Sequence, residues 1–331
     1  MYVWDNNWLA QYGEDAIEPG LPIVDPHHHL WYRDGMSRYM LDDLQADTGG
    51  GHLVESTVFM ECQWGYHTDG PEHLRPVGET ETIAELAERS GASGAEIKGI
   101  ISFADMTLGD EVDEVLIAHI ESGRGRFRGI RHATAFDPST DIRRTHTRPT
   151  PQLMSDPQFR RGVQRLADRE LSFDAWLYHP QICELTDLAR AVPDCTFVLD
   201  HLGGMVGTGP YAGHRATILE QWRLDMTELA QCPNVVLKVG GIGMVLFGLG
   251  FEHRSAPPSS DDLVTAWGEP IEFAIQLFGP DRCMFESNFP VDKMSCSYVV
   301  LWNAFKKIAV DMSATEKAAL FHDTATRVYR L

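Results

Sequence analysis

The sequence predicts an α/β fold, a single (β/α)8 TIM barrel in which eight parallel strands alternate with helices. Two observations indicate this fold: short apolar, β-branched runs recur along the chain, and segments with helical periodicity follow nearly all of them. No linker divides the 331 residues into two parts. We therefore expect one domain over residues 1–331, with residues 1–20 as an N-terminal arm and extended loops at the C-terminal face of the barrel.

Eight runs satisfy the strand pattern in order along the chain. They are Leu21–Leu30, Leu53–Gln63, Ile97–Met106, Phe127–Ala135, Leu171–His179, Cys195–Leu202, Val235–Val239 and Cys283–Phe289. The helix candidates are Glu79–Arg89, Asp110–Glu121, Asp156–Arg169, Ile182–Ala191, Ala212–Ala230, Asp261–Phe278, Ser295–Val310 and Ala314–Phe321. The long polar and glycine-rich segments follow strands, and loops in that position form the mouth of a barrel, where active sites are built.

Composition limits the partners and the location that we expect. The chain has 28 Lys+Arg against 48 Asp+Glu, a formal net charge of −20, which repels phosphate backbones and argues against a nucleic-acid partner. The N-terminus is acidic, no apolar run is long enough for a membrane span, and the six cysteines form no CxxC pair. We expect a cytoplasmic protein with free thiols that acts on a small molecule, as a monomer or as a homo-oligomer.

The first predicted strand contains the strongest local motif, IVDPHHHLW, with Asp25, His27 and His29 at alternate positions. Side chains two residues apart on a strand point to the same side and lie about 7 Å apart. Imidazole nitrogens suit Zn²⁺, Mn²⁺ or Fe²⁺. His27 and His29 are therefore predicted to converge on one ion, the alternative being a polar turn at the end of a strand.

Two further histidines end later strands, His179 in FDAWLYHPQ and His201 in FVLDHLGG. Either alone is more often a capping or core residue. Because the strands of a barrel converge at its mouth, they would join His27 and His29 in one cluster of imidazoles. We predict His27, His29, His179 and His201 as catalytic candidates, the first two and His201 also as candidate metal ligands. If His179 points inward, Tyr178 alternates outward.

These motifs resemble those of the amidohydrolase superfamily, in particular the amidohydrolase-2 group, which includes sugar-lactone lactonases, pyrone-dicarboxylate lactonase and sulfomuconolactone hydrolase. The resemblance rests on DPHHHLW, FDAWLYHPQ, VLDHLGG, NVVLKVGG and FESNFPVDK, which fall in the family's order and extend over most of the chain from Ile23. It implies a hydrolase that opens a lactone or cyclic ester of a small carboxylic acid by attack of an activated water. It also implies a strand-eight aspartate as metal ligand and general base.

This sequence departs from that pattern at strand eight, where the aspartate is replaced by Asn288. An amide cannot accept a proton from water at neutral pH and is a poorer ligand for a divalent cation than a carboxylate. Glu286, two residues earlier on the same strand, could supply the lost carboxylate, or could instead pair with Lys238 or an arginine. Asp292 and Asp25 are the other candidates for the base.

The fourth strand limits the number of metal ions. In the amidohydrolases that the chain resembles, binuclear sites use a carboxylated lysine there, whereas GIRHATAF has Arg131 and His132 but no lysine. The resemblance therefore implies one divalent ion, Zn²⁺ or Mn²⁺, or a metal-free site because Asn288 replaces the usual aspartate.

Three more residues are candidates for substrate binding. The guanidinium of Arg131 could hold a substrate carboxylate bidentately, or could pair with Glu61 or Asp137 inside the protein. Lys238 on the seventh strand could stabilise an oxyanion or pair with a buried acid. Glu61, which follows the second strand, is a candidate for the pocket wall.

Two other functions compete with the hydrolase. Related amidohydrolases carry out metal-dependent decarboxylation on the same scaffold, a lyase reaction that is also expected to need the strand-eight aspartate. The second alternative is a degenerate, non-catalytic binding barrel that has lost its base.

Overall fold

The computed structural model describes residues 2–92 and 94–331, and it confirms the predicted barrel. Eight parallel strands pair in chain order, from β1 with β2 to β7 with β8. They are β1 (Pro22–His28), β2 (Leu53–Met60), β3 (Glu96–Ser102), β4 (Phe127–Ile130), β5 (Ser172–Ala175), β6 (Thr196–Leu199), β7 (Val235–Gly240) and β8 (Cys283–Glu286). The backbone N–H groups of His29 and Asn288 donate to Phe289 and His27 at 2.8 and 2.9 Å, which brings the two ends of the sheet together.

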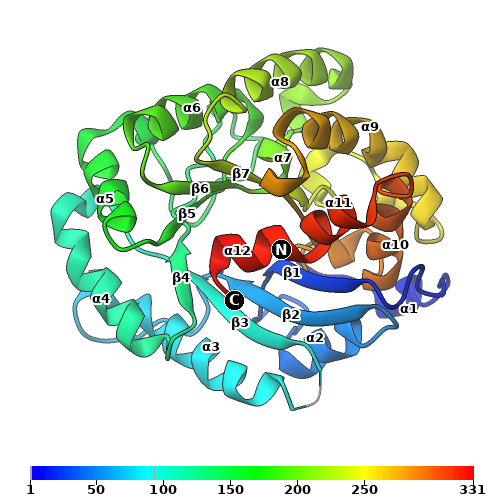
Figure 1. Cartoon of the computed structure of the whole chain (residues 1–331), viewed down its shortest axis with the longest axis horizontal. Helices are drawn as coiled ribbons and strands as arrows, with labels where there is room; N and C mark the ends of the chain where they lie inside the picture. The colour runs from blue at the N-terminus through cyan, green and yellow to red at the C-terminus, as the bar shows by residue number, and fades with distance from the viewer. Residues whose placement is uncertain (1, 93) are drawn as a thin grey trace.

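Helices surround the barrel, as Figure 1 shows. They are α1 (Asn6–Leu9), α2 (Leu41–Thr48), α3 (Val77–Ser90), α4 (Val112–Ser122), α5 (Pro157–Ala167), α6 (Ile182–Ala191), α7 (His201–Gly204), α8 (Arg215–Leu229), α9 (Ser260–Phe278), α10 (Tyr298–Ile308), α11 (Ala314–Ala318) and α12 (Thr324–Tyr329). Helices α1, α2, α7 and α12 lie outside the predicted helices, because each has eight residues or fewer and is too short to show clear periodicity. Within the described residues, none of these helices has the length and apolarity that crossing a bilayer requires.

The interior of the barrel is layered. Its lowest layer, near the amino ends of the strands, is apolar and contains Val24, Val58, Ile101, Val198, Val236 and Met284. Helix α12 lies across this end of the barrel in Figure 1 and packs Ala325, Val328 and Tyr329 against the apolar layer. Tyr329 also donates from its hydroxyl to Asp174 at 2.6 Å, so α12 contacts the next, charged layer as well.

An irregularity in β1 decides which of its side chains face inward. The register with β2 shifts between Asp25 and His28, so the simple alternation predicted for this strand does not hold there. Asp25 accepts from the backbone N–H of Ser287 at 3.0 Å and from the hydroxyl of Tyr298 on α10 at 2.9 Å. These contacts tie β1 to β8 and α10, so Asp25 has a structural role and is not placed to take a proton from substrate.

One buried histidine far from the strand-one motif gives a testable pH dependence. His119 on α4 pairs its Nδ1 with the Thr80 hydroxyl at 2.8 Å and its Nε2 with the Phe103 carbonyl at 3.0 Å. Burial lowers its pKa to about 4. The unfolded chain therefore binds a proton that the folded chain does not, and stability is lost as the pH falls from about 6.5 toward 4.

The measurement is the free energy of unfolding in urea at pH 7 and at pH 4. We expect the decrease in this free energy between the two pH values to be smaller in His119→Leu than in the wild type, by up to about 3 kcal/mol. The slope is the readout, because loss of the two hydrogen bonds lowers stability at every pH. His253, whose side chain is 81% exposed, provides the control substitution His253→Leu. An unchanged slope in His119→Leu would contradict the assignment.

Candidate active site

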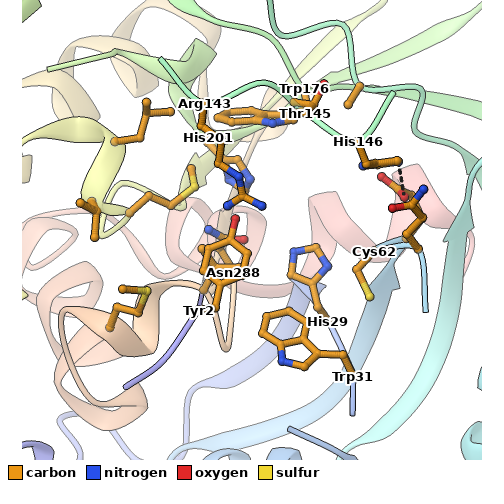
Figure 2. Close-up of a pocket in the computed structure, with 18 of the residues that line it drawn as sticks. Tyr2, His29, Trp31, Cys62, Arg143, Thr145, His146, Trp176, His201 and Asn288 are labelled. Carbon is orange, nitrogen blue, oxygen red and sulfur yellow. Dashed lines mark ion pairs between the residues drawn. The ribbon is translucent and has the colours of Figure 1, made fainter. Parts of the chain in front are cut away.

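A cavity of about 470 Å³ opens at the carboxyl ends of the strands. The loops after β2, β4 and β7 contribute to its wall, as expected for the mouth of a barrel. The side chains that reach it from the strand ends are His29, Arg131, Trp176, Tyr178, His201 and Asn288. Figure 2 shows His29, Trp176, His201 and Asn288 around one space, with Trp31 and Tyr2 beside them.

Glu286 connects two of the predicted histidines below this cavity. Its Oε1 lies 2.7 Å from Nδ1 of His201, and its Oε2 lies 2.8 Å from Nδ1 of His27. All three side chains are buried. Burial opposes ionisation of Glu286, but His201 and His27 outweigh it and lower the pKa of this carboxyl to about 2. Glu286 is therefore a carboxylate whose Oε1 accepts from Nδ1 of His201, while its Oε2 lies beside the His27 ring with no hydrogen-bond partner among the described residues.

These contacts define the proton arrangement of His201. Because a carboxylate only accepts, Nδ1 of His201 carries the hydrogen, so in the neutral form of the ring Nε2 is the acceptor, and the ring lines the cavity. The backbone of His201 has φ of 54° and its N–H also donates to Glu286 Oε1, at 3.1 Å. A Cβ at Gly241, itself at φ of 64°, would lie 1.9 Å from His201 Nδ1, so only glycine leaves room for the ring.

His29 presents a second acceptor on the cavity wall. Its Nδ1 lies 2.8 Å from the carbonyl of Met60, which can only accept, so this nitrogen carries the hydrogen and Nε2 does not. Burial, with the nearby Arg131 cation, lowers the pKa of His29 to about 3, which keeps the ring neutral. The rings of His27 and His29 lie 5.0 Å apart between centroids, and those of His27 and His201 lie 4.5 Å apart.

A charged layer lies below the histidines. Lys238 Nζ lies 2.7 Å from Asp174 Oδ2 and 3.1 Å from Asp200 Oδ1, and all three side chains are fully buried. Lys238 therefore takes the structural alternative of pairing with barrel acids. Asp174 and Asp200 were not among the predicted site residues. The signal that could have found them is their position in β5 and directly after β6, in the motifs that contain His179 and His201.

Arg131 is also paired with a buried acid, Glu61. Its Nε donates to Glu61 Oε1 at 2.9 Å, its Nη2 to the Glu61 carbonyl at 2.5 Å, and its Nη1 lies 3.6 Å from Asp200. Glu61 also lies 3.3 Å from His146 Nε2. Burial opposes ionisation of Glu61, but His146 and Arg131 lower its pKa to about 2. Of the two roles predicted for Arg131, the structure contains the ion pair with Glu61, and both residues still line the cavity.

Asn288 lines the cavity, and its side-chain NH₂ group is hydrogen-bonded to a buried carboxyl group. Its Nδ2 donates to Asp292 Oδ1 at 2.8 Å, and Asp292 Oδ2 accepts from the backbone N–H of Gly243 at 2.8 Å. Asp292 is fully buried, and burial raises its pKa to about 7. The side-chain oxygen of Asn288 is thus left as the group that can accept a hydrogen bond in the cavity.

His179 is the predicted catalytic residue that the structure does not bring into the cavity. Its Nδ1 accepts from the backbone N–H of Val206 at 3.2 Å, and burial lowers its pKa to about 4. Trp176 and Tyr178 line the cavity instead. Side chains alternate in direction along β5 and its continuation. Asp174 points into the barrel, so Trp176 and Tyr178 point to the same side and His179 points away from it.

The family model for amidohydrolases matches residues 24–331 of this chain. The chain belongs to the amidohydrolase family. A 36% identical relative of this amidohydrolase is the uncharacterized protein y4mH of Sinorhizobium fredii, with 94% of this chain and 99% of the relative aligned. An L-fucono-1,5-lactonase of Burkholderia multivorans is 27% identical, with 93% and 96% aligned.

A solved structure supports the fold of this amidohydrolase. An amidohydrolase from Burkholderia multivorans, crystallised with bound zinc, superposes with a TM-score of 0.69 at 24% identity, over 93% of this chain and 99% of that chain. At this identity the likeness supports the barrel fold alone.

The only candidate metal cluster among the described residues joins His27, His201 and Glu286, whose donor atoms lie within 4.8 Å of one another. His29 is not part of it. Two imidazoles and a carboxylate are donors that Zn²⁺ accepts. Nδ1 of His201 is hydrogen-bonded to Glu286 Oε1, Nδ1 of His27 lies 2.8 Å from Glu286 Oε2, and Lys238 and Arg131 approach the two nitrogens of His27 to 3.3 Å each. Buried carboxylates outnumber these two cations, since Glu286, Asp174 and Asp200 lie in the same region, and Glu286 Oε2 has no hydrogen-bond partner among the described residues. The residues therefore fit one divalent ion, which His27, His201 and Glu286 would hold and which would polarise a carbonyl or a water, and no step below depends on it.

Proposed function

We propose that this amidohydrolase opens a lactone or cyclic ester of a small carboxylic acid by attack of water. The observation that carries the proposal is the pair of Glu286 and His201, in which a buried carboxylate orients an imidazole whose free Nε2 belongs to the cavity wall. Such a pair is the arrangement of a general base, because the carboxylate stabilises the imidazolium that forms when the ring takes a proton. It also supplies a base on a barrel whose strand-eight position is Asn288.

In the proposed reaction, a water lies between His201 and the lactone carbonyl. His201 Nε2 takes one proton as the water oxygen bonds to the carbonyl carbon, and His29 Nε2 accepts the second hydrogen, which orients the water. The negative charge that develops on the carbonyl oxygen is stabilised by the cation of Arg131 at the cavity floor. The ring C–O bond then breaks, and the proton on His201 passes to the leaving alkoxide, so the product is a hydroxy acid.

The test is a panel of lactones incubated with the purified protein, followed by NMR of the product and by titration of the released acid. A hydroxy acid formed without CO₂ is expected, and we expect His201→Gln to lower kcat by about three orders of magnitude, the size of a general-base contribution. Release of CO₂ from a carboxylated substrate would instead support the decarboxylase.

The variant Asn288→Asp separates a working site from a degenerate one. If the wild type opens lactones and Asn288→Asp lowers that activity, Asn288 belongs to the working site. If the wild type opens none and Asn288→Asp creates the activity, the protein is a barrel that has lost its base, and the proposal fails.

A further inference from the structure

Three arginines line the cavity, and two of them are committed to protein groups. Arg131 is paired with Glu61, and Arg33 donates from Nη2 to the carbonyl of Cys62 at 2.5 Å. The third, Arg143, lies on the loop after β4. Among the residues that the structure describes, no side chain or carbonyl accepts a hydrogen bond from its guanidinium, and no carboxylate lies within ion-pair distance of it, Asp141 on the same loop included.

The Arg143 side chain is nevertheless held in place. Its guanidinium carbon lies 4.7 Å from the centroid of the Tyr2 ring, and Tyr2 in turn stacks on Trp31 with 5.6 Å between centroids. Its backbone carbonyl accepts from the hydroxyl of Tyr178 at 2.5 Å. A guanidinium that stacks through its face leaves its in-plane N–H donors free to form two parallel hydrogen bonds. Figure 2 shows Arg143 directed into the cavity, toward the space between Tyr2 and His201.

We propose that Arg143 binds a carboxylate of the substrate and makes this cavity selective for an anionic ring over a neutral one. A protein with a net charge of −20 does not attract anions in general, so selectivity needs a local, unpaired cation. Arg143 is such a cation, and it is the guanidinium of the three whose donors are all free for a bidentate pair. This is the role that the sequence suggested for Arg131, whose guanidinium is paired with Glu61 instead. It rests on the proposed lactone opening only for the position of the carboxylate relative to the reacting carbonyl.

The experiment compares two probes that differ in one charge, 5-oxotetrahydrofuran-2-carboxylate and its neutral carboxamide, in the wild type, Arg143→Gln and Tyr2→Leu. Arg144, an exposed neighbour outside the cavity, provides the matched control Arg144→Gln. We expect Arg143→Gln to raise KM for the carboxylate about a hundredfold with little change for the carboxamide, the size of a lost charge-assisted pair. Tyr2→Leu, which removes the stacking partner, should raise KM in the same direction by a smaller factor, and Arg144→Gln should leave both probes unchanged.

A binding measurement separates this inference from the proposed reaction. Calorimetry with 2-hydroxyglutarate, the ring-opened acid, needs no turnover: it is expected to bind the wild type and to bind Arg143→Gln about a hundredfold more weakly. If that difference appears while no lactone is opened, the anion site stands and the proposed reaction fails. If Arg143→Gln binds 2-hydroxyglutarate as well as the wild type, or if the wild type prefers the carboxamide, the role of Arg143 is refuted.

Discussion

Glu286→Gln is expected to lower kcat for lactone opening by about three orders of magnitude while KM changes little. Glu286 Oε1 accepts from Nδ1 and from the backbone N–H of His201. A glutamine can keep these hydrogen bonds but carries no charge, so the negative charge that stabilises the His201 imidazolium would be gone. KM should be nearly unaffected because Glu286 is fully buried below the cavity.

Glu79→Gln is the matched control for this substitution. Glu79 is also a fully buried glutamate near the site, and burial together with Glu61 raises its pKa to about 8, so a neutral amide resembles its state at neutral pH. The measurements are steady-state kinetics, circular dichroism and elemental analysis of both variants. Equal kcat values in the two variants would remove Glu286 from the mechanism. Stoichiometric zinc in the wild type that is lost from Glu286→Gln would show that the three donors hold a metal.

Lys238→Met should cost about 3–5 kcal/mol of stability, the range for breaking a buried ion pair by removing one partner. Asp174 and Asp200 would remain in the barrel interior without the cation that lies 2.7 and 3.1 Å from them. The measurement is the free energy of unfolding in urea together with the melting temperature, which should fall by roughly 10 °C for a chain of this size.

The exposed pair of Lys307 and Asp261 gives the comparison, since Lys307→Met removes the same type of residue where water can replace the partner. Its loss should stay below about 1 kcal/mol. In the double variant Asp174→Asn, Lys238→Met, part of the lost stability should return because one buried charge has been removed as well. A Lys238→Met protein as stable as Lys307→Met would mean that the charged layer contributes little to stability.

The fold could be predicted almost completely from the sequence because it depends on a pattern that repeats eight times. Each strand is a short apolar run and most are followed by an amphipathic helix, so an error at one boundary does not change the architecture. The error was local: the register of β1 shifts after Asp25, whose side chain contacts α10, and such a shift depends on the pairing with β2 and not on the pattern of β1 alone. Helix α12 was missed because six residues contain too little periodicity.

The candidate site was predictable only in part, for a similar reason. Strand-end histidines mark the mouth of a barrel, so His27, His29 and His201 could be named from their motifs. Which partner each polar group selects depends on side chains brought together from distant strands, as with Lys238 and Asp174, 64 positions apart. Arg143 lies on an irregular loop, where no periodicity indicates direction, and its stacking partner Tyr2 comes from the N-terminal arm.

The position of α12 has a consequence for how the molecule is made. The helix that covers the amino end of the barrel and donates to Asp174 is synthesised after all eight strands that it covers. During translation, the apolar layer beneath it and the carboxylate of Asp174 therefore remain open to water until residues 324–329 have left the ribosome. Completion of the charged layer that supports the histidines thus requires the docking of α12 and does not follow from closure of the sheet alone.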